Sequence, residues 1–259
     1  MTTDGKQNAP SHSYDRVAHL YDLDMARNMA FDDIGCYVDI ARGSAGRALE
    51  IGCGNGRILR PLLESGADAF GIDYSAAMLA QLCAKDRAGS ACGRVARMDA
   101  RSLAFGCDFA LVLCAYSLAT YMTSVDDMRA LVSETLRVLR PGGRLVVDAF
   151  IPRARAQTID FRLDYRRRYA AGELARSKRV TEVRAGINRI ERHYEVRDND
   201  GVLIDEVDTV EEIRPLAPDA LMAAWARPDV SLDATLWDYR EQDRPAAAQF
   251  CTLILRKKR

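Results

Sequence analysis

The 259-residue sequence has little of what a metal centre or a disulfide framework needs. It contains three histidines and seven cysteines, and no two cysteines stand in a CxxC spacing. The histidines offer no zinc-ligand spacing, so we expect no metal. Because the cysteines are odd in number and unpatterned, we expect reduced thiols in a cytoplasmic protein.

An excess of one charge sign and a long apolar run are also missing. Lysine plus arginine equals aspartate plus glutamate at 37 each, which gives no global electrostatic case for a nucleic-acid partner. The polar start lacks the apolar core of a signal peptide, and no run approaches the length of a membrane span. We therefore expect a disordered tail over residues 1–13, no membrane partner, and a globular monomer or homodimer.

Short apolar runs alternate with amphipathic segments over residues 47–150. This alternation predicts an α/β fold with a doubly wound, mostly parallel sheet. The predicted strands are 47–51, 68–73, 94–99, 109–115 and 144–150, and the predicted helices are 56–65, 75–85 and 124–140. Ser75 is a natural N-cap, and the Pro-Gly-Gly of residues 141–143 should separate the last helix from the last strand.

The pattern changes after residue 150. An arginine-dense stretch leads into alternating segments around Asn199-Asp200-Gly201, which is a strong hairpin signal. We expect an antiparallel β insertion over residues 151–214, following a core over residues 14–150. Residues 215–259 should return to the core as a helix and two closing strands.

The glycine-rich turn Gly52-Cys53-Gly54-Asn55-Gly56 follows a strand that carries Glu50. Glycines there let a backbone approach a nucleotide closely, but the GxGxG spacing differs from the GxGxxG of an NAD fingerprint. Asp73 ends the second predicted strand, where a carboxylate can accept both hydroxyls of a ribose. Asp99 ends the third and could meet an adenine amino group, with the Ala100 backbone beside it.

These segments, read as "LEIGCGNGR", "GIDYS", "MDARSL" and "LRVLRPGGRLVV", resemble class I S-adenosylmethionine (SAM)-dependent methyltransferases over about residues 14–149 plus the C-terminal strands. The resemblance implies a Rossmann-like fold, SAM as cofactor and S-adenosylhomocysteine as product. The insertion resembles the lid of small-molecule members that act on amino sugars and glycine-type amines. An ordinary Rossmann dehydrogenase would need a nicotinamide pocket and a proton donor, and neither is visible.

The resemblance implies a cofactor site drawn from several segments. Glu50 should act electrostatically toward the cationic part of SAM, and Arg27 could pair with its carboxylate. Tyr14 and Tyr21 should close over the cofactor, or else pin their helix to the core. Tyr74 and Met78 should flank the adenine, with helix core as the alternative for Met78. The full expected set is Tyr14, Tyr21, Arg27, Glu50, Gly52, Cys53, Gly54, Gly56, Asp73, Tyr74, Met78, Asp99, Ala100, Arg101 and Cys114.

The acceptor should lie beyond the fourth strand, at "CAYSLATYM". Tyr121 and Tyr116 are the candidates to orient it, and His193 is the candidate base; packing or a structural role is the alternative for each. Arginines of the lid could clamp a carboxylate or phosphate, or form a solvated face: Arg162, Arg166, Arg167, Arg168, Arg176, Arg189 and Arg192.

The sequence has no Pro-Pro-aromatic signature of the kind found in enzymes that methylate nucleic acids, so the expected partner is a small polar molecule methylated at nitrogen or oxygen. Two alternatives share the same cofactor motifs. One is an intramolecular alkylation that releases methylthioadenosine, and the other is a non-catalytic SAM-binding regulatory domain.

Overall fold

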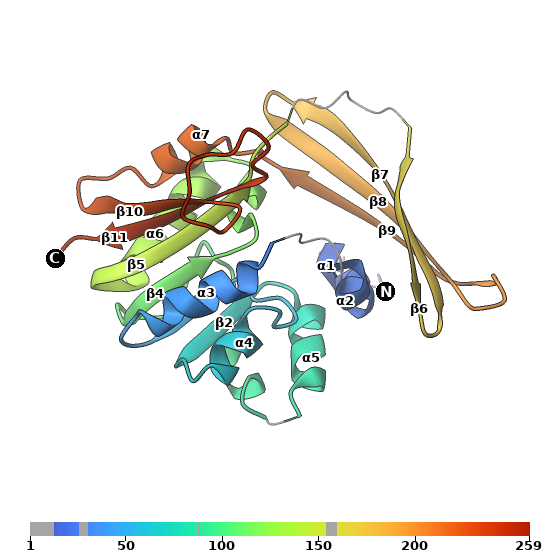
Figure 1. The fold of residues 1–259 in the computed structure, drawn as a ribbon, viewed down its shortest axis with the longest axis horizontal. Helices are drawn as coiled ribbons and strands as arrows, with labels where there is room; N and C mark the ends of the chain where they lie inside the picture. Colours follow the sequence, from blue (N-terminus) through green and yellow to red (C-terminus); the bar gives the residue numbers. More distant parts are fainter. Residues whose placement is uncertain (1–12, 26–30, 88, 154–159) are drawn as a thin grey trace, which may run out of the picture.

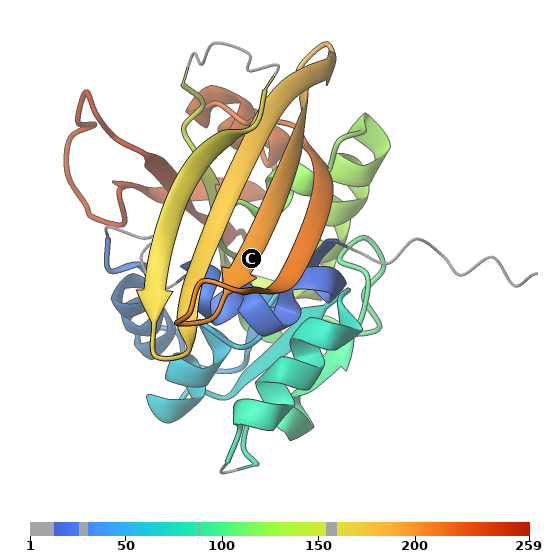
Figure 2. The same ribbon diagram turned by 90° about the vertical axis from the view of Figure 1, so that its right-hand side faces the viewer.

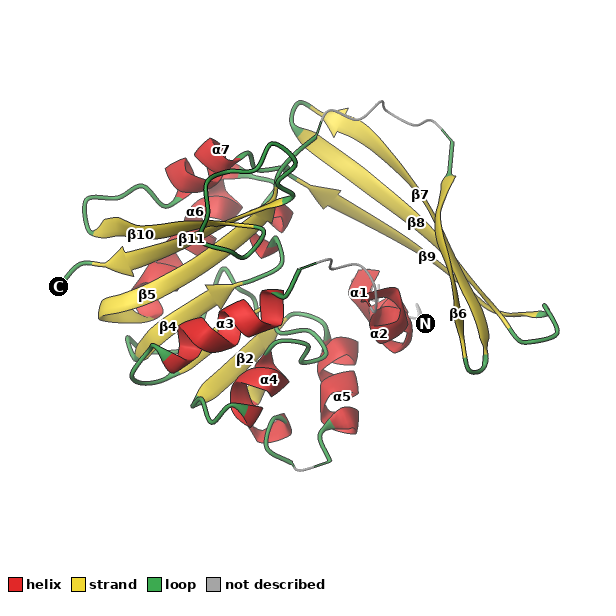
Figure 3. Ribbon diagram, in the orientation of Figure 1, coloured by secondary structure: helices red, strands yellow, loops and turns green. Residues whose placement is uncertain are grey.

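The computed structural model describes residues 13–25, 31–87, 89–153 and 160–259. They form two sheets, shown in Figure 1 and coloured by secondary structure in Figure 3. The larger sheet has seven strands in the order β10-β11-β5-β4-β1-β2-β3, and the smaller has four in the order β6-β7-β8-β9. The predicted tail lies outside the described residues except for Ser13, which starts the first helix.

The strand pairs of the larger sheet are parallel except at β11, which pairs antiparallel with both β5 and β10. Its strands are β1 (Ala48–Ile51), β2 (Ala69–Asp73), β3 (Val95–Arg97), β4 (Phe109–Cys114), β5 (Leu139–Phe150), β10 (Val230–Trp237) and β11 (Phe250–Lys257). The predicted doubly wound, mostly parallel sheet with an antiparallel insertion after the fifth strand is confirmed.

Helices cover both faces of this sheet because its strands are apolar on both faces. Leu49, Val112 and Val147 pack with one layer of helices, and their neighbours Ala48 and Leu111 pack with the other. The first layer holds α6 (Val125–Val138) and α7 (Pro218–Ala224), and the second holds α3 (Asp33–Arg42), α4 (Leu59–Glu64) and α5 (Ala76–Lys85).

Two predicted boundaries were wrong, and glycine conformation explains both. The helix predicted from residue 56 begins at Leu59, because Gly52, Gly54 and Gly56 all have positive φ, which a right-handed helix does not allow. Pro141-Gly142-Gly143 does not separate helix from strand. It lies inside β5, where the register against β4 shifts between Leu139 and Arg144 and Gly142 has a φ of 78°.

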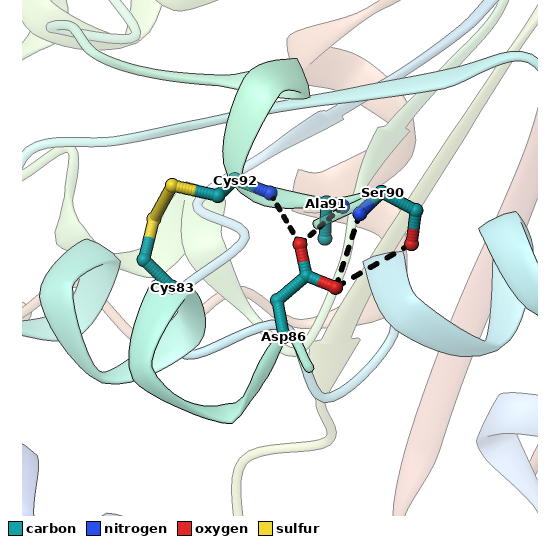
Figure 4. The surroundings of a disulfide bond; sticks show 5 residues. All are labelled: Cys83, Asp86, Ser90, Ala91 and Cys92. Carbon is teal, nitrogen blue, oxygen red and sulfur yellow. Dashed lines mark hydrogen bonds between the residues drawn. A yellow bond between two sulfur atoms is a disulfide. The ribbon is translucent and has the colours of Figure 1, made fainter. Parts of the chain in front are cut away.

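The prediction that all cysteines are reduced was wrong for Cys83 and Cys92, which form a disulfide between the end of α5 and the approach to β3 (Figure 4). Asp86 organises the intervening loop by accepting hydrogen bonds from the backbone N–H groups of Ala91 (2.6 Å) and Cys92 (2.8 Å). The nine-residue separation carries no motif, so only the fold brings these thiols together. The other five cysteines are free.

The smaller sheet consists of β6 (Arg162–Tyr169), β7 (Gly172–Arg184), β8 (Ile187–Arg197) and β9 (Leu203–Ile213), and we call it the lid. Asn199-Asp200-Gly201 lies in the β8–β9 connection, as predicted. Figure 2 shows the lid spread over the N-terminal helices, which separate it from the core. No helix among the described residues combines the length and apolarity that crossing a membrane requires.

The N-terminal helices fill the space between the lid and the core. α1 (Ser13–Val17), the 3-10 turn η1 (Ala18–Leu20) and α2 (Tyr21–Met25) make up this segment. Its apolar residues Val17 and Leu20 are buried against Leu174, Tyr194 and Val207 of the lid. The lid therefore has its own small apolar core, which is incomplete without residues 13–25.

Asp24 forms the polar centre of this contact. Its carboxylate accepts hydrogen bonds from Tyr165, from Arg176 Nη1 (2.6 Å) and from Tyr194 (3.2 Å), each on a different lid strand. Arg167 donates to the backbone carbonyl groups of the same turn. Since Asp24 is 9% exposed, these donors replace the water that the charge has lost.

Two further carboxylates attach the same helices to the core. Asp15 Oδ1 accepts hydrogen bonds from Ser75 Oγ (2.6 Å) and from the Ala77 backbone N–H (3.3 Å), at the start of α5. Asp22 accepts from Asn55 Nδ2 at 2.6 Å, within the glycine-rich turn. Residues 13–25 are thus connected to both sheets at once.

We expect Asp24→Asn to lower the free energy of unfolding by about 3 kcal/mol, because it leaves the buried Arg176 without its full countercharge. Urea denaturation measures the change. The matched control, Asp208→Asn, removes the same charge from an exposed position on the lid and should change stability by less than about 0.5 kcal/mol. Equal stability of the two variants would contradict the assigned role of Asp24.

Candidate functional site

A cavity of about 560 Å³ opens between the carboxyl ends of β1, β2 and β4, the N-terminal helices and β9. Topological switch points of this kind are where open α/β sheets bind ligands. Most of the sequence-predicted site residues line it: Tyr14, Tyr21, Gly52, Gly54, Asp73, Tyr74, Met78, Asp99, Ala100, Arg101, Tyr116 and Tyr121.

Asp73 organises the half of the cavity that lies beside the glycine-rich turn. Its Oδ2 accepts a hydrogen bond from the Gly54 backbone N–H and its Oδ1 accepts one from Ser75, both at 2.8 Å. Gly54 has a φ of 54°, so the turn folds back onto this carboxylate. A carboxylate can accept hydrogen bonds from both hydroxyls of a diol, which is the chemistry expected of a ribose site.

The residues after β2 and β3 provide a mixed apolar and polar wall. Met78 and Met98 line the cavity beside Tyr74, whose ring lies 5.5 Å from the Arg97 guanidinium carbon. Asp99 is held by Arg101, which also pairs with Asp127. The Arg101 guanidinium holds the pKa of Asp99 below its usual value, so this carboxylate is charged near neutral pH.

Four predicted cofactor contacts do not line the cavity. Cys53, Gly56 and Cys114 belong to the packing beneath the turn: an added Cβ on Gly56 would meet Leu82 at 3.0 Å, and both cysteines are buried. Glu50 is 3% exposed, and burial raises its pKa to about 8. Arg27 lies outside the described residues.

The loop after β4 presents the two tyrosines predicted to orient an acceptor. Tyr116 and Ser117 both have left-handed backbone conformations, with φ of 54° and 63°. The fully buried Asp148 holds them by accepting hydrogen bonds from their N–H groups at 3.1 and 2.8 Å. This contact offsets the strain that a non-glycine residue incurs there and fixes where Tyr116 and Tyr121 enter the cavity.

Tyr121 belongs to a polar chain that the sequence did not reveal in full. Its hydroxyl lies 2.7 Å from that of Tyr14 and 3.5 Å from Glu211 Oε2 on β9, and Arg192 Nη1 on β8 reaches the same carboxylate oxygen at 2.6 Å. Burial raises the pKa of both tyrosines well above 10, so each keeps its proton. Their hydroxyls can position a group but do not serve as bases.

The structure does not bring His193 into the cavity. Strand alternation turns its neighbours Arg192 and Tyr194 inward, so His193 lies on the outer face of the lid. Its Nδ1 is 2.8 Å from Asp208. The expectation that His193 acts as a base is therefore not supported by its position.

Most of the predicted clamp arginines are already paired within the protein. Arg176 and Arg167 hold the Asp24 turn, while Arg189 and Arg192 pair with glutamates of β9. Arg166 and Arg168 both pair with Glu173. Arg162 is exposed on β6. The described residues contain no group of side chains that could hold a metal ion.

Sequence reasoning missed Ser13, Met98, Leu118, Met122 and the β9 residues 210–212, which also line the cavity. Those of β9 lie about 90 residues after Tyr121, and no motif marks them. Only the strand register of the lid could have indicated that Glu211 faces inward.

Residues 48–143 match the family described as "Methyltransferase domain". The chain is 30% identical over 138 residues to the putative methyltransferase YqeM of Bacillus subtilis (strain 168). The matched region covers 52% of this chain and 54% of that relative, so the chain spans about half the relative's length. The fold is shared with two solved structures. The CcbJ methyltransferase from Streptomyces caelestis has a TM-score of 0.79 at 19% identity, covering 97% of this chain and 100% of its own. The sugar N-methyltransferase KedS8 from Streptoalloteichus sp. ATCC 53650 has a TM-score of 0.70 at 22% identity, covering 100% and 98%.

The buried Glu50 predicts how stability depends on pH. Its pKa is about 8 in the folded chain against an ordinary 4.5, so the folded state holds this proton more tightly. The free energy of unfolding should therefore fall as pH rises from about 4.5 to 8, by a few kcal/mol in total. Glu50→Gln should lack this contribution, so the variant should be more stable than the wild type above pH 8. Urea denaturation across this range checks it, and parallel pH curves for the two proteins would contradict it.

Proposed function

We propose that the protein transfers the methyl group of SAM to nitrogen or oxygen of a small polar metabolite. Residues 48–143 match the family described as "Methyltransferase domain", and the chain shares its fold with solved methyltransferases, which supports the proposal. The observation that carries this proposal is the cavity itself. It joins the Asp73 turn, suited to a nucleoside, to the tyrosines and carboxylate beneath the lid.

The residues of the cofactor half fit SAM in their chemistry. Asp73 is a carboxylate of the kind that accepts hydrogen bonds from ribose hydroxyls, and Met78 and Met98 offer an apolar flank for adenine beside Asp99 and Ala100. The bound cofactor would supply a methyl carbon already activated by the sulfonium. The protein then has to position the nucleophile in line with the C–S bond and to exclude water.

The acceptor half supplies positioning groups. Tyr116 and Tyr121 enter from the loop that Asp148 fixes, and Tyr14 enters from α1. His193 lies on the outer face of the lid, and Tyr14 and Tyr121 keep their protons. The acceptor would therefore have to be nucleophilic without help from a strong base. Structures of similar fold include the sugar N-methyltransferase KedS8 and CalS10, an amino pentose methyltransferase from Micromonospora echinaspora, which supports a small polar acceptor.

Incubation of the purified protein with SAM and a small-metabolite extract tests the reaction. Formation of S-adenosylhomocysteine together with a product heavier by one CH₂ would support methyl transfer. Methylthioadenosine from SAM alone would indicate intramolecular alkylation instead, and SAM binding without turnover would indicate a regulatory domain.

We expect Asp73→Ala to weaken S-adenosylhomocysteine binding by roughly 100-fold in calorimetry, because a charged acceptor of two hydroxyls is lost. Since Asp73 also holds the glycine-rich turn, Asp73→Asn is the companion variant; it retains one acceptor oxygen and should bind with intermediate affinity. Asp108→Ala, an exposed carboxylate that pairs with Arg47, is the control and should bind as the wild type does. Unchanged affinity in Asp73→Ala, with circular dichroism confirming its fold, would contradict the cofactor assignment.

A further inference from the structure

The lining of the cavity is acidic. Its charged members among the described residues are Asp73, Asp99, Glu211 and Glu212 against a single base, Arg101. Three of these carboxylates are engaged elsewhere: Asp73 by the glycine-rich turn and Ser75, Asp99 by Arg101, and Glu212 by Arg184 and Arg189 on the lid. Glu211 is the carboxylate left to face an acceptor.

Only one oxygen of Glu211 is engaged. The contacts from Arg192 Nη1 (2.6 Å) and from the Tyr121 hydroxyl (3.5 Å) both reach Oε2. Among the described residues, Oε1 has no hydrogen-bond partner. Unlike Glu50 Oε2, this atom is not fully buried. With the residue 8% exposed, Oε1 keeps some access to solvent, and Glu211 is one of the residues that line the cavity.

The contacts behind the carboxylate fix its position. Arg192 is itself largely buried, with 19% of its side chain exposed, and it approaches from the neighbouring strand β8. Tyr14 and Tyr121 extend the same network to α1 and to the loop after β4. A charge held in this way has a fixed direction, which is the condition for electrostatic stabilisation of a transition state.

We propose that Glu211 Oε1 binds the methyl acceptor by accepting a hydrogen bond from its amino group, and that the acceptor class is a small amine methylated at nitrogen. This inference rests on the function proposed above and assigns to that site a residue and a substrate class.

The reaction moves positive charge toward Glu211. An acceptor that binds as the ammonium first releases one proton to solvent. The neutral amine then attacks with its lone pair, an N–C bond forms, and the C–S bond breaks with its electron pair passing to sulfur. The products are S-adenosylhomocysteine and a methylated ammonium, whose extra proton leaves with it to solvent. The positive charge that begins on sulfur therefore ends on the nitrogen beside the Glu211 carboxylate, which stabilises it as it develops.

Other acceptor classes fit this arrangement less well. A carboxylate or phosphate acceptor would meet the charge of Glu211, with the lid arginines other than the exposed Arg162 already engaged. A hydroxyl acceptor would have to lose its proton during attack, and the nearby tyrosines hold their own protons. An amine needs neither a cationic clamp nor a strong base.

A blocked-amine experiment tests the proposal. The protein is incubated with deuteromethyl-labelled SAM and two metabolite pools from the organism that encodes it, one untreated and one whose amines have been acetylated. We expect labelled product in the untreated pool, bearing the label on nitrogen by tandem mass spectrometry, and at least a tenfold loss in the acetylated pool. Label that persists after acetylation, or no labelled product in either pool, would overturn the inference.

Variants locate the effect at Glu211. Glu211→Gln should lower the rate of labelling about 100-fold while S-adenosylhomocysteine affinity in calorimetry stays within about twofold. Glu206→Gln is the matched control, since it removes the same charge from an exposed site on the same strand and should label at the wild-type rate. If Glu211→Gln does not fold, Glu211→Asp keeps the charge but withdraws it by one methylene, and it should also label slowly.

The two proposals fail in distinguishable ways. If the wild-type protein does not bind S-adenosylhomocysteine, the proposed function itself is contradicted. Intact binding together with a wild-type labelling rate in Glu211→Gln would overturn only the role of Glu211.

Discussion

The buried carboxylate of Asp24 is the contact on which the arrangement of lid and core depends. It gathers donors from β6, β7 and β8, while Asp15 and Asp22 of the same helices bind α5 and the glycine-rich turn. The lid and the core are consequently joined through a short segment of helices, in addition to the direct contacts of β9 with the loop after β4. Since Tyr14 and Tyr21 lie on that segment, the cavity takes its shape only when these contacts are made.

Buried charge recurs around the site, and each case is compensated differently. Asp148 is fully buried, and its pKa is raised to about 6 by lost hydration although several donors surround it. It holds the left-handed turn at Tyr116, so its cost supports a strained loop at the acceptor side. Glu50 has fewer partners and the larger shift, to about 8. The free-energy cost of burying these carboxyl groups is tolerated where the side chains of a site must be held in position before the ligand binds.

The sequence was sufficient for features that depend on local chemistry. Strand alternation, the Ser75 cap and the Asn199-Asp200-Gly201 turn each act within a few residues, and the structure has them. The outward position of His193 and the inward position of Glu211 depend on contacts between distant segments, and the Cys83–Cys92 pair depends on how the loop between α5 and β3 folds. No local pattern encodes those contacts, so they required the fold.

The two sides of the cavity differ in how far apart in the sequence their residues lie. Asp73 and the glycine-rich turn lie on adjacent parallel strands, whose carboxyl ends meet because of the sheet. Glu211 and Tyr121 come from the lid and from the loop after β4, and they meet only when the lid is seated on α1 and α2. A change in the lid can therefore alter the acceptor side without disturbing Asp73. Under the proposed function, substitutions on β9 would therefore change the part of the cavity that meets the acceptor and leave the Asp73 side as it is.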